Sequence, residues 1–90
     1  MSSVRMHVWA RGRVQGVFFR AEARARAESL GVAGWIRNAD DGSVEAVFEG
    51  EDQQVESLLD WCRRGPAGAL VEEVQAVREA PAGEAGFQVR

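Results

Sequence analysis

The chain has 90 residues, of which 46% are hydrophobic and 28% charged, and its formal net charge at pH 7 is −3. These values are ordinary for a soluble globular protein, and we expect a single domain over residues 1–90. No apolar run approaches the ~20 residues that a membrane span requires, and the N-terminus holds no apolar segment of a signal peptide. Cys62 is the only cysteine, which excludes an internal disulfide and fits a reducing compartment, so we expect a cytoplasmic protein.

The charge is divided unevenly along the chain. Residues 1–38 carry seven arginines and two acidic residues, whereas residues 39–90 carry four arginines and twelve acidic residues. A positively charged region attracts small anions, and this one contains the most distinctive motif of the sequence. An uneven surface charge without any function is the open alternative.

The first part of the chain predicts a strand, a helix and a second strand. Residues 4–11 alternate apolar and polar side chains, which is typical of a half-buried strand. Residues 18–30 place apolar side chains at helical spacing, and Gly31 follows where a helix end favours glycine. Residues 32–38 predict the second strand.

The rest of the chain predicts a hairpin, a helix and two further strands. Asp40-Asp41-Gly42 is typical of a hairpin turn, and residues 43–49 predict the third strand. A helix then begins at Glu51 or Asp52 and ends at Gly65, with an apolar stripe at helical spacing formed by Val55, Leu58, Leu59 and Cys62. A strand over residues 69–78, whose imperfect alternation suggests a bulge, and a short strand over residues 87–89 follow.

This order, β-α-β-β-α-β plus a short final strand, predicts an α+β fold: a ferredoxin-like sandwich with two helices on one face of an antiparallel sheet. The first β-α-β crossover makes the first two strands run in the same direction. Their C-terminal ends therefore lie at the same end of the sheet. The segment after the first strand and Asn38, at the end of the second, should meet there.

Residues 12–18, here called the Gly loop, begin the segment G-R-V-Q-G-V-F-F-R between the first strand and the first helix. A short glycine-containing loop before a helix presents free backbone N–H groups, and such a concavity binds anions, phosphate above all. The P-loop of nucleotide-binding proteins is excluded, because Gly16 is not followed by Lys-Ser/Thr. We expect the backbone of the following residues to hold one phosphoryl group: Gly12, Arg13, Val14, Gln15, Gly16, Val17 and Phe18.

Two side chains complete the predicted site. Arg20, on the first turn of the helix, carries a planar fork of donors that can hold two phosphate oxygens. The alternative is an arginine paired with a nearby glutamate on a solvated helix face. Asn38 has no useful basicity, but its amide can orient a water molecule for attack. The alternative is an asparagine that only initiates the following turn.

Other reactive residue types favour structural roles. His7 lies in mid-strand, so a structural histidine is the better interpretation than a general base. Trp9 and Trp35 are expected to cover the sheet face opposite the helices, and Cys62 to lie in the core. Asp40 and the aspartate after it are typical of a turn. No cluster of His and Cys is present, so we predict no metal and no cofactor.

The segments at residues 12–20 and 34–44, G-W-I-R-N-A-D-D-G-S-V, closely resemble the two signature segments of acylphosphatases, and the resemblance covers essentially the whole chain. It implies the ferredoxin-like fold and hydrolysis of the carboxyl-phosphate bond to a carboxylate and inorganic phosphate. Family substrates include carbamoyl phosphate, 1,3-bisphosphoglycerate and aspartyl phosphates. By position, Arg20 would bind the phosphoryl group with backbone N–H groups of roughly residues 13–18, and Asn38 would position the attacking water. The resemblance also implies that a phosphate oxygen of the substrate accepts the water's proton.

Three alternatives stay open. An RNA-binding module shares this element order, but Glu45, Val47 and Glu49 are expected on the exposed face of the third strand, where such modules carry aromatic residues. A phosphate- or anion-binding regulatory module would keep the loop without the chemistry. A detached relative of a segment of a larger carbamoyl-transfer protein is the third. We favour a small, free-standing monomeric enzyme that acts on an acyl phosphate, with no nucleic-acid or membrane partner.

Overall fold

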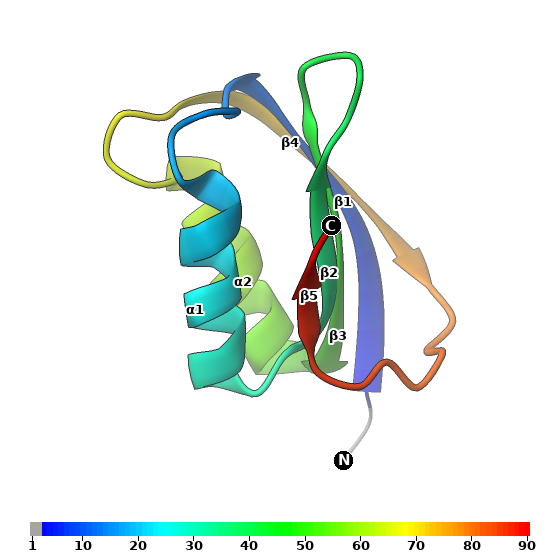
Figure 1. Cartoon of the computed structure of the whole chain (residues 1–90). Coiled ribbons are helices and arrows are strands. Elements are labelled where there is room, and N and C mark those ends of the chain that lie inside the picture. Colours follow the sequence, from blue (N-terminus) through cyan, green and yellow to red (C-terminus); the bar gives the residue numbers. More distant parts are fainter. Residues whose placement is uncertain (1–2) are drawn as a thin grey trace.

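The computed structural model describes residues 3–90, and its elements follow the predicted order (Figure 1). All strand and helix boundaries agree with the predicted ones within two residues. The elements are β1 (Ser3–Arg13), α1 (Phe19–Leu30), β2 (Ala33–Asn38), β3 (Val44–Glu51), α2 (Asp52–Arg64), β4 (Leu70–Glu79) and β5 (Phe87–Val89).

The strands form one sheet in the order β4-β1-β3-β2-β5. Strands β1 to β4 pair antiparallel, whereas the short β5 adds to β2 in parallel. β1 and β2 run in the same direction on either side of β3, as the first crossover requires. Their C-terminal ends lie at one end of the sheet, and the predicted ferredoxin-like architecture is confirmed.

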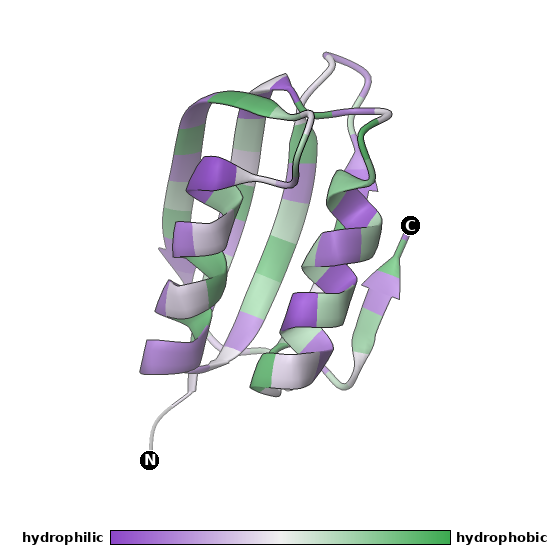
Figure 2. Cartoon of the chain, turned by 90° about the vertical axis from the view of Figure 1, so that its left-hand side faces the viewer, coloured by the Kyte–Doolittle hydropathy of each residue, from purple (hydrophilic) through white to green (hydrophobic). Residues whose placement is uncertain are grey.

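Both helices cover the same face of the sheet (Figure 1). α1 packs against β2 and β5, and α2 packs against β1, β3 and β4. Hydrophilic and hydrophobic residues alternate along both helices (Figure 2), as expected for helices with one solvated side. Neither helix has the length and apolarity of a membrane span within residues 3–90. The predicted apolar stripe of α2 is confirmed and gains Trp61; its buried residues are Val55, Leu58, Leu59, Trp61 and Cys62.

β1 extends two residues beyond the predicted strand, because it stays paired with β4 up to Arg13. Arg11 faces Glu73 and Gly12 faces Val71, so Glu72 is the extra residue of a bulge in β4. This confirms the bulge that the imperfect alternation suggested. The strands approach so closely here that a Cβ at Gly12 would lie 2.2 Å from a β4 carbonyl oxygen.

One expectation about β3 is wrong: Val47 and Glu49 are buried, although they project from the face opposite the helices. Val47 lies between His7 and Trp35 in the register, and the rings of these neighbours pack edge to face with centroids 6.0 Å apart. Glu49 is covered because the chain after β4 crosses back over this face. The tryptophan and histidine rings thus cover part of this face, as expected for Trp35.

The Glu49 carboxylate is held by the segment that crosses it. It accepts backbone hydrogen bonds from Ala82, Gly83 and Glu84 at 2.7–3.2 Å, and Arg5 donates to it at 3.1 Å. Burial alone would raise the pKa of Glu49, but these donors outweigh it and lower the pKa below its usual value. The buried Glu49 carboxylate therefore holds the 80–86 segment against the sheet through hydrogen bonds.

Candidate active site

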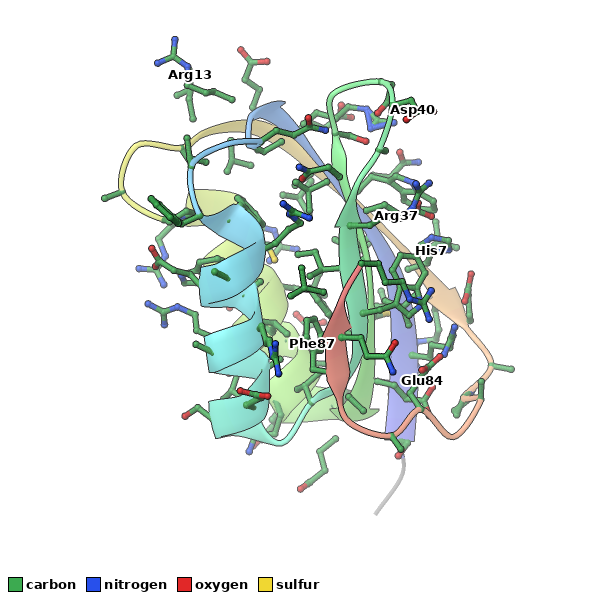
Figure 3. All side chains as sticks on the ribbon, in the orientation of Figure 1. His7, Arg13, Arg37, Asp40, Glu84 and Phe87 are labelled. Atoms are coloured by element: carbon green, nitrogen blue, oxygen red, sulfur yellow. The ribbon has the colours of Figure 1, made fainter. Side chains whose placement is uncertain are left out.

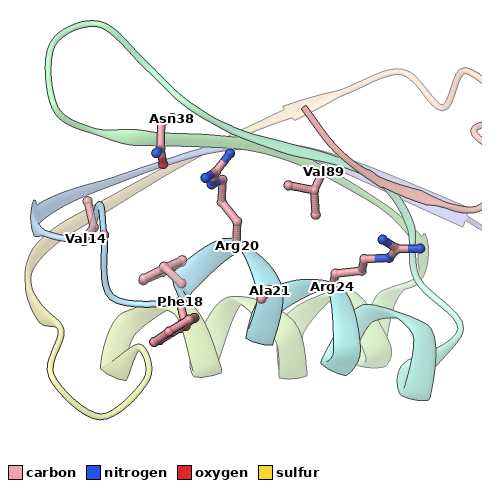
Figure 4. Close-up of a pocket in the computed structure, with 9 residues that line it drawn as sticks. Val14, Phe18, Arg20, Ala21, Arg24, Asn38 and Val89 are labelled. Carbon is pink, nitrogen blue, oxygen red and sulfur yellow. The ribbon is translucent and has the colours of Figure 1, made fainter.

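A cleft of about 540 Å³ opens where the C-terminal ends of β1 and β2 meet the start of α1. Figure 4 shows Asn38 on the sheet side of this cleft, with Arg20 extending from α1 toward the sheet. Five of the nine predicted site residues line this cleft: Val14, Gly16, Phe18, Arg20 and Asn38. The lining residues are Val14, Gly16, Phe18, Phe19, Arg20, Ala21, Arg24, Asn38 and Val89.

The backbone of the Gly loop has the conformation of an anion-binding concavity. Gly16 and Phe18 both have left-handed dihedrals, with φ of 75° and 63°. Within residues 3–90, the backbone N–H groups of residues 15–21 donate no hydrogen bond; the first helical bond runs from Glu22 N–H to the Phe18 carbonyl. Left-handed residues alternating with ordinary ones turn successive N–H groups to one side. The loop and the first turn of α1 thus offer a row of free donors beside the cleft.

The first two residues of the predicted loop have another position. Gly12 and Arg13 belong to β1 and pair with Val71 and Leu70 of β4. Figure 3 shows the Arg13 side chain projecting outward at the sheet end rather than toward the cleft. The irregular part of the Gly loop therefore begins at Val14, whose side chain is buried. The predicted loop was two residues too long, because the pairing with β4, which local sequence does not indicate, extends β1 through Gly12 and Arg13.

The Gln15 side chain joins the Gly loop to the turn that follows β2. Its Nε2 donates to the carbonyl oxygens of Ala39 at 2.9 Å and of Ser43 at 3.0 Å. Gln15 was expected to contribute only its backbone, and no local pattern indicates this contact. The bond pair ties the anion-binding loop to the segment that carries Asn38.

Arg20 pairs with no aspartate or glutamate side chain within the described residues. Its Nη1 donates to the main-chain oxygen of Arg90 at 3.1 Å, and the side chain is half-buried. The alternative interpretation, a surface arginine paired with a glutamate, thus finds no support. Arg24, one turn later, is paired with Glu28 at 3.3 Å. Among residues 3–90, Arg20 is the lining arginine without an aspartate or glutamate partner.

Asn38 ends β2, and its Oδ1 is buried without a hydrogen-bond partner within residues 3–90. The turn after it is stabilised by another residue: Asp41 accepts hydrogen bonds from the backbone N–H of Ser43 at 2.9 Å and from its hydroxyl at 2.6 Å. The Ser43 hydroxyl, with its backbone N–H, lowers the pKa of Asp41. The Asn38 amide is therefore not used in the turn, and an unpaired buried acceptor beside a cleft calls for a ligand or water.

The other reactive side chains lie away from this cleft. His7 is on the opposite face of the sheet (Figure 3), between Glu45 at 2.6 Å and Glu79 at 2.9 Å. Its ring stacks on Trp9 with centroids 4.1 Å apart, a structural role as expected. Cys62 is buried in the core, and burial raises the pKa of its thiol to about 12. Among residues 3–90, no three His, Cys, Asp or Glu side chains form a group that could hold a metal ion.

The C-terminal strand and the residue after it contribute side-chain and main-chain contacts that the sequence did not indicate. Val89 of β5 lines the cleft, and Arg90 contacts Arg20. β5 reaches the site because it pairs with β2 and packs against α1. Since a three-residue strand has no periodicity that reveals its partner, this proximity depends on tertiary structure alone.

Taken together, the cleft combines free backbone donors, a guanidinium and an amide oxygen. The donors and the guanidinium can stabilise negative charge on a tetrahedral oxyanion group, and the amide can accept a hydrogen bond from a water molecule. Among residues 3–90, no nucleophilic hydroxyl, thiol or carboxylate side chain lines the cleft. Chemistry in which water attacks a bound phosphoryl group suits this set of groups.

Comparison with known proteins identifies relatives of the same size. The family model described as Acylphosphatase matches residues 6–89. An acylphosphatase of Gloeobacter violaceus is 53% identical over 98% of this chain and 95% of the relative, and one of Haloarcula marismortui is 51% identical over 100% and 99%. The solved structure of an acylphosphatase from Coxiella burnetii superposes with a TM-score of 0.94, at 38% identity, over 98% of this chain and 93% of that one.

Proposed function

Because this chain belongs to the acylphosphatase family and is an acyl phosphate hydrolase, we propose that its cleft hydrolyses the carboxyl-phosphate bond by holding the phosphoryl group and directing a water to it. Arg20 and the free backbone N–H groups of residues 15–18, in the Gly loop, bind the phosphoryl oxygens, and Asn38 orients the water. The observation that carries this proposal is the cleft itself: within residues 3–90, a guanidinium without an aspartate or glutamate partner and an unpaired amide oxygen share it with a row of free donors.

The charge of the transition state decides what the protein must supply. Phosphoryl transfer passes through a loose transition state, with charge spread over the three non-bridging oxygens. The Arg20 guanidinium and the backbone N–H groups can stay hydrogen-bonded to these oxygens as their charge changes. A guanidinium keeps its own charge throughout the useful pH range. Because a carboxylate is a good leaving group, no strong general acid is required. Positioning and charge stabilisation are therefore sufficient.

The water is activated without a basic side chain of the protein. The Asn38 Oδ1 accepts one hydrogen bond and so fixes the direction in which the water presents its lone pair. Its amide is not basic enough to remove a proton. The proton goes instead to an oxygen of the substrate's own phosphoryl group, which leaves inorganic phosphate and the carboxylate as products.

The proposal includes a metal-independent, monomeric, cytoplasmic enzyme without a cofactor. The guanidinium and the backbone N–H groups supply the positive charge for which many phosphoryl-transfer enzymes use Mg²⁺. The lone thiol of Cys62 is buried, so it offers no ready intermolecular disulfide. The substrate of the phosphoryl site is a small acyl phosphate, and neither nucleic acid nor a membrane takes part.

The test is hydrolysis of benzoyl phosphate with excess chelator, beside the phosphate monoester p-nitrophenyl phosphate. The proposal predicts turnover of the acyl phosphate that resists the chelator and far slower turnover of the monoester, whose leaving group is poorer. Folded protein that binds inorganic phosphate but hydrolyses neither compound would favour the anion-binding regulatory module. Turnover that disappears with the chelator and returns with Mg²⁺ would contradict metal independence.

A further inference from the structure

Two adjacent phenylalanines at the start of α1 have opposite environments. Phe19 is 2% exposed, and its ring packs on Trp61 of α2 with centroids 5.2 Å apart. Phe18 is 79% exposed. Phe19 thus accounts for the core contact between the helices, and the Phe18 ring contributes little to the fold.

Besides its exposed ring, Phe18 has an unfavourable backbone conformation. It is the one residue other than glycine with positive φ among residues 3–90, at 63°. Bulky side chains rarely adopt this conformation, whereas glycine or asparagine adopt it readily. The turn of the loop requires the left-handed dihedral, but it does not require an aromatic side chain at this position. A large apolar side chain that is both strained and solvated indicates a role outside the folded core.

The position of Phe18 relates that role to the cleft. It lines the same cleft as Arg20 and Asn38. In Figure 4, Asn38 projects from the sheet, whereas Phe18 stands on the loop side at the start of α1. In-line transfer requires the attacking water and the leaving group on opposite sides of phosphorus. If Asn38 directs the water from the sheet side, the leaving acyl group emerges toward the loop side, where Phe18 lies.

The cleft also has room and apolar surface beyond a phosphoryl group. Its volume is about 540 Å³. Val89 lines the sheet side (Figure 4), so Phe18 supplies the large exposed apolar surface on the loop side. No aspartate or glutamate of the described chain lines the cleft. An apolar acyl group can therefore cover exposed hydrocarbon of the protein while its phosphoryl end occupies the polar side.

We propose that the exposed ring of Phe18 forms the acyl-group subsite of the cleft and selects acyl phosphates with an aromatic or bulky apolar acyl group over small ones. This inference rests on the proposed function, because it assigns the substrate class of that same site. The acyl group packs on the face or edge of the Phe18 ring and removes it from water. A small acyl group such as acetyl leaves most of the ring exposed and gains little.

The test compares kcat/KM for benzoyl phosphate and acetyl phosphate in wild type and in variants of Phe18. The ratio of the two values is the readout, because both substrates present the same phosphoryl group and any change in the loop largely cancels. Phe18→Asn removes the ring but tolerates the left-handed backbone. Phe18→Tyr keeps an aromatic ring. Val77→Ala, at a 46% exposed site on β4 outside the cleft, is the matched control.

Wild type is expected to favour benzoyl phosphate, and Phe18→Asn to lower the ratio by about tenfold, the range expected for a lost apolar contact. Phe18→Tyr should restore the ratio and Val77→Ala leave it unchanged. An unaltered ratio in Phe18→Asn, in an enzyme that still hydrolyses both substrates, would overturn the subsite while leaving the proposed function intact. A wild type that hydrolyses neither substrate would overturn both.

Discussion

The side-chain amide of Gln15 donates a 2.9 Å hydrogen bond to the carbonyl of Ala39, the residue that directly follows Asn38. A second bond from the same nitrogen reaches Ser43 at 3.0 Å. These bonds connect the loop proposed to bind phosphate with the strand end proposed to orient water. The relative position of the two parts, on which in-line attack depends, is thus held by one side chain.

Replacement of this side chain should therefore affect activity more than folding. Gln15→Ala removes one donor from each of two carbonyl oxygens, which keep the backbone N–H groups of Gly42 and Ala39 as donors, so we expect a cost of only about 1 kcal/mol of the free energy of unfolding. It should also lower kcat more than it raises KM for benzoyl phosphate, because the phosphoryl contacts survive while the water is less well placed. Urea unfolding and steady-state kinetics measure the two effects. Gln53→Ala, on the exposed side of α2, is the control, and a Gln15→Ala enzyme with unchanged kcat would contradict the positioning role.

Arg20→Ala should remove both phosphate binding and turnover. Loss of one charge-stabilising donor in such sites lowers the rate by about 10²–10³-fold, and inhibition by inorganic phosphate should disappear with it. Arg26→Ala is the matched control: it lies on the same helix outside the cleft, with its guanidinium 5.2 Å from the Trp61 ring. Kinetics with and without inorganic phosphate measure both effects. Equal losses in the two variants would show that only the general positive charge of α1 matters.

Asn38→Ala should separate binding from turnover. The variant keeps the Gly loop and Arg20, so the inhibition constant of inorganic phosphate should stay close to that of the wild type. Turnover of benzoyl phosphate should be lost, because no other side chain that lines the cleft among residues 3–90 carries a hydrogen-bond acceptor for the water. The division of roles between Asn38 and Arg20 would be wrong if phosphate inhibition disappeared in this variant too.

The buried carboxylate of Glu49 should make stability depend on pH. Its pKa is lowered from the usual 4.5, so the ionised form stabilises the fold above that value, and the contribution is lost as the pH falls through the lower folded pKa. Glu49→Gln should cost about 2 kcal/mol at pH 7, as expected for hydrogen bonds to a charged group. The difference from wild type should shrink below pH 4. Urea unfolding at pH 7 and pH 3.5 measures this, and an undiminished difference at the lower pH would contradict it.

Local patterns were sufficient to predict the elements and the approximate place of the site. Period-two alternation predicted β1, helical spacing predicted both helices, and Gly31 marked the end of α1, where it has a φ of 73°. The crossover rule then brought Asn38 to the end of the sheet at which β1 ends. Each of these inferences uses interactions within a few residues of one another, or a general rule of topology.

What the sequence did not predict depends on distant segments. The burial of Val47 and Glu49 comes from neighbouring strands and from the 80–86 segment, which no pattern in β3 indicates. The left-handed backbone of Phe18 opposes the intrinsic preference of its own residue type. The Gln15 bonds join residues 24 and 28 positions apart. Such contacts form only once the whole sheet is assembled.

The central claim, that water held by Asn38 attacks a phosphoryl group held by Arg20 and the Gly loop, is tested most directly by isotope transfer. Benzoyl phosphate is hydrolysed by the enzyme in H₂¹⁸O, and the products are analysed by mass spectrometry. Attack at phosphorus predicts one ¹⁸O in inorganic phosphate and none in benzoate. Enzyme-dependent appearance of ¹⁸O in benzoate would mean attack at the carbonyl carbon and would contradict the account.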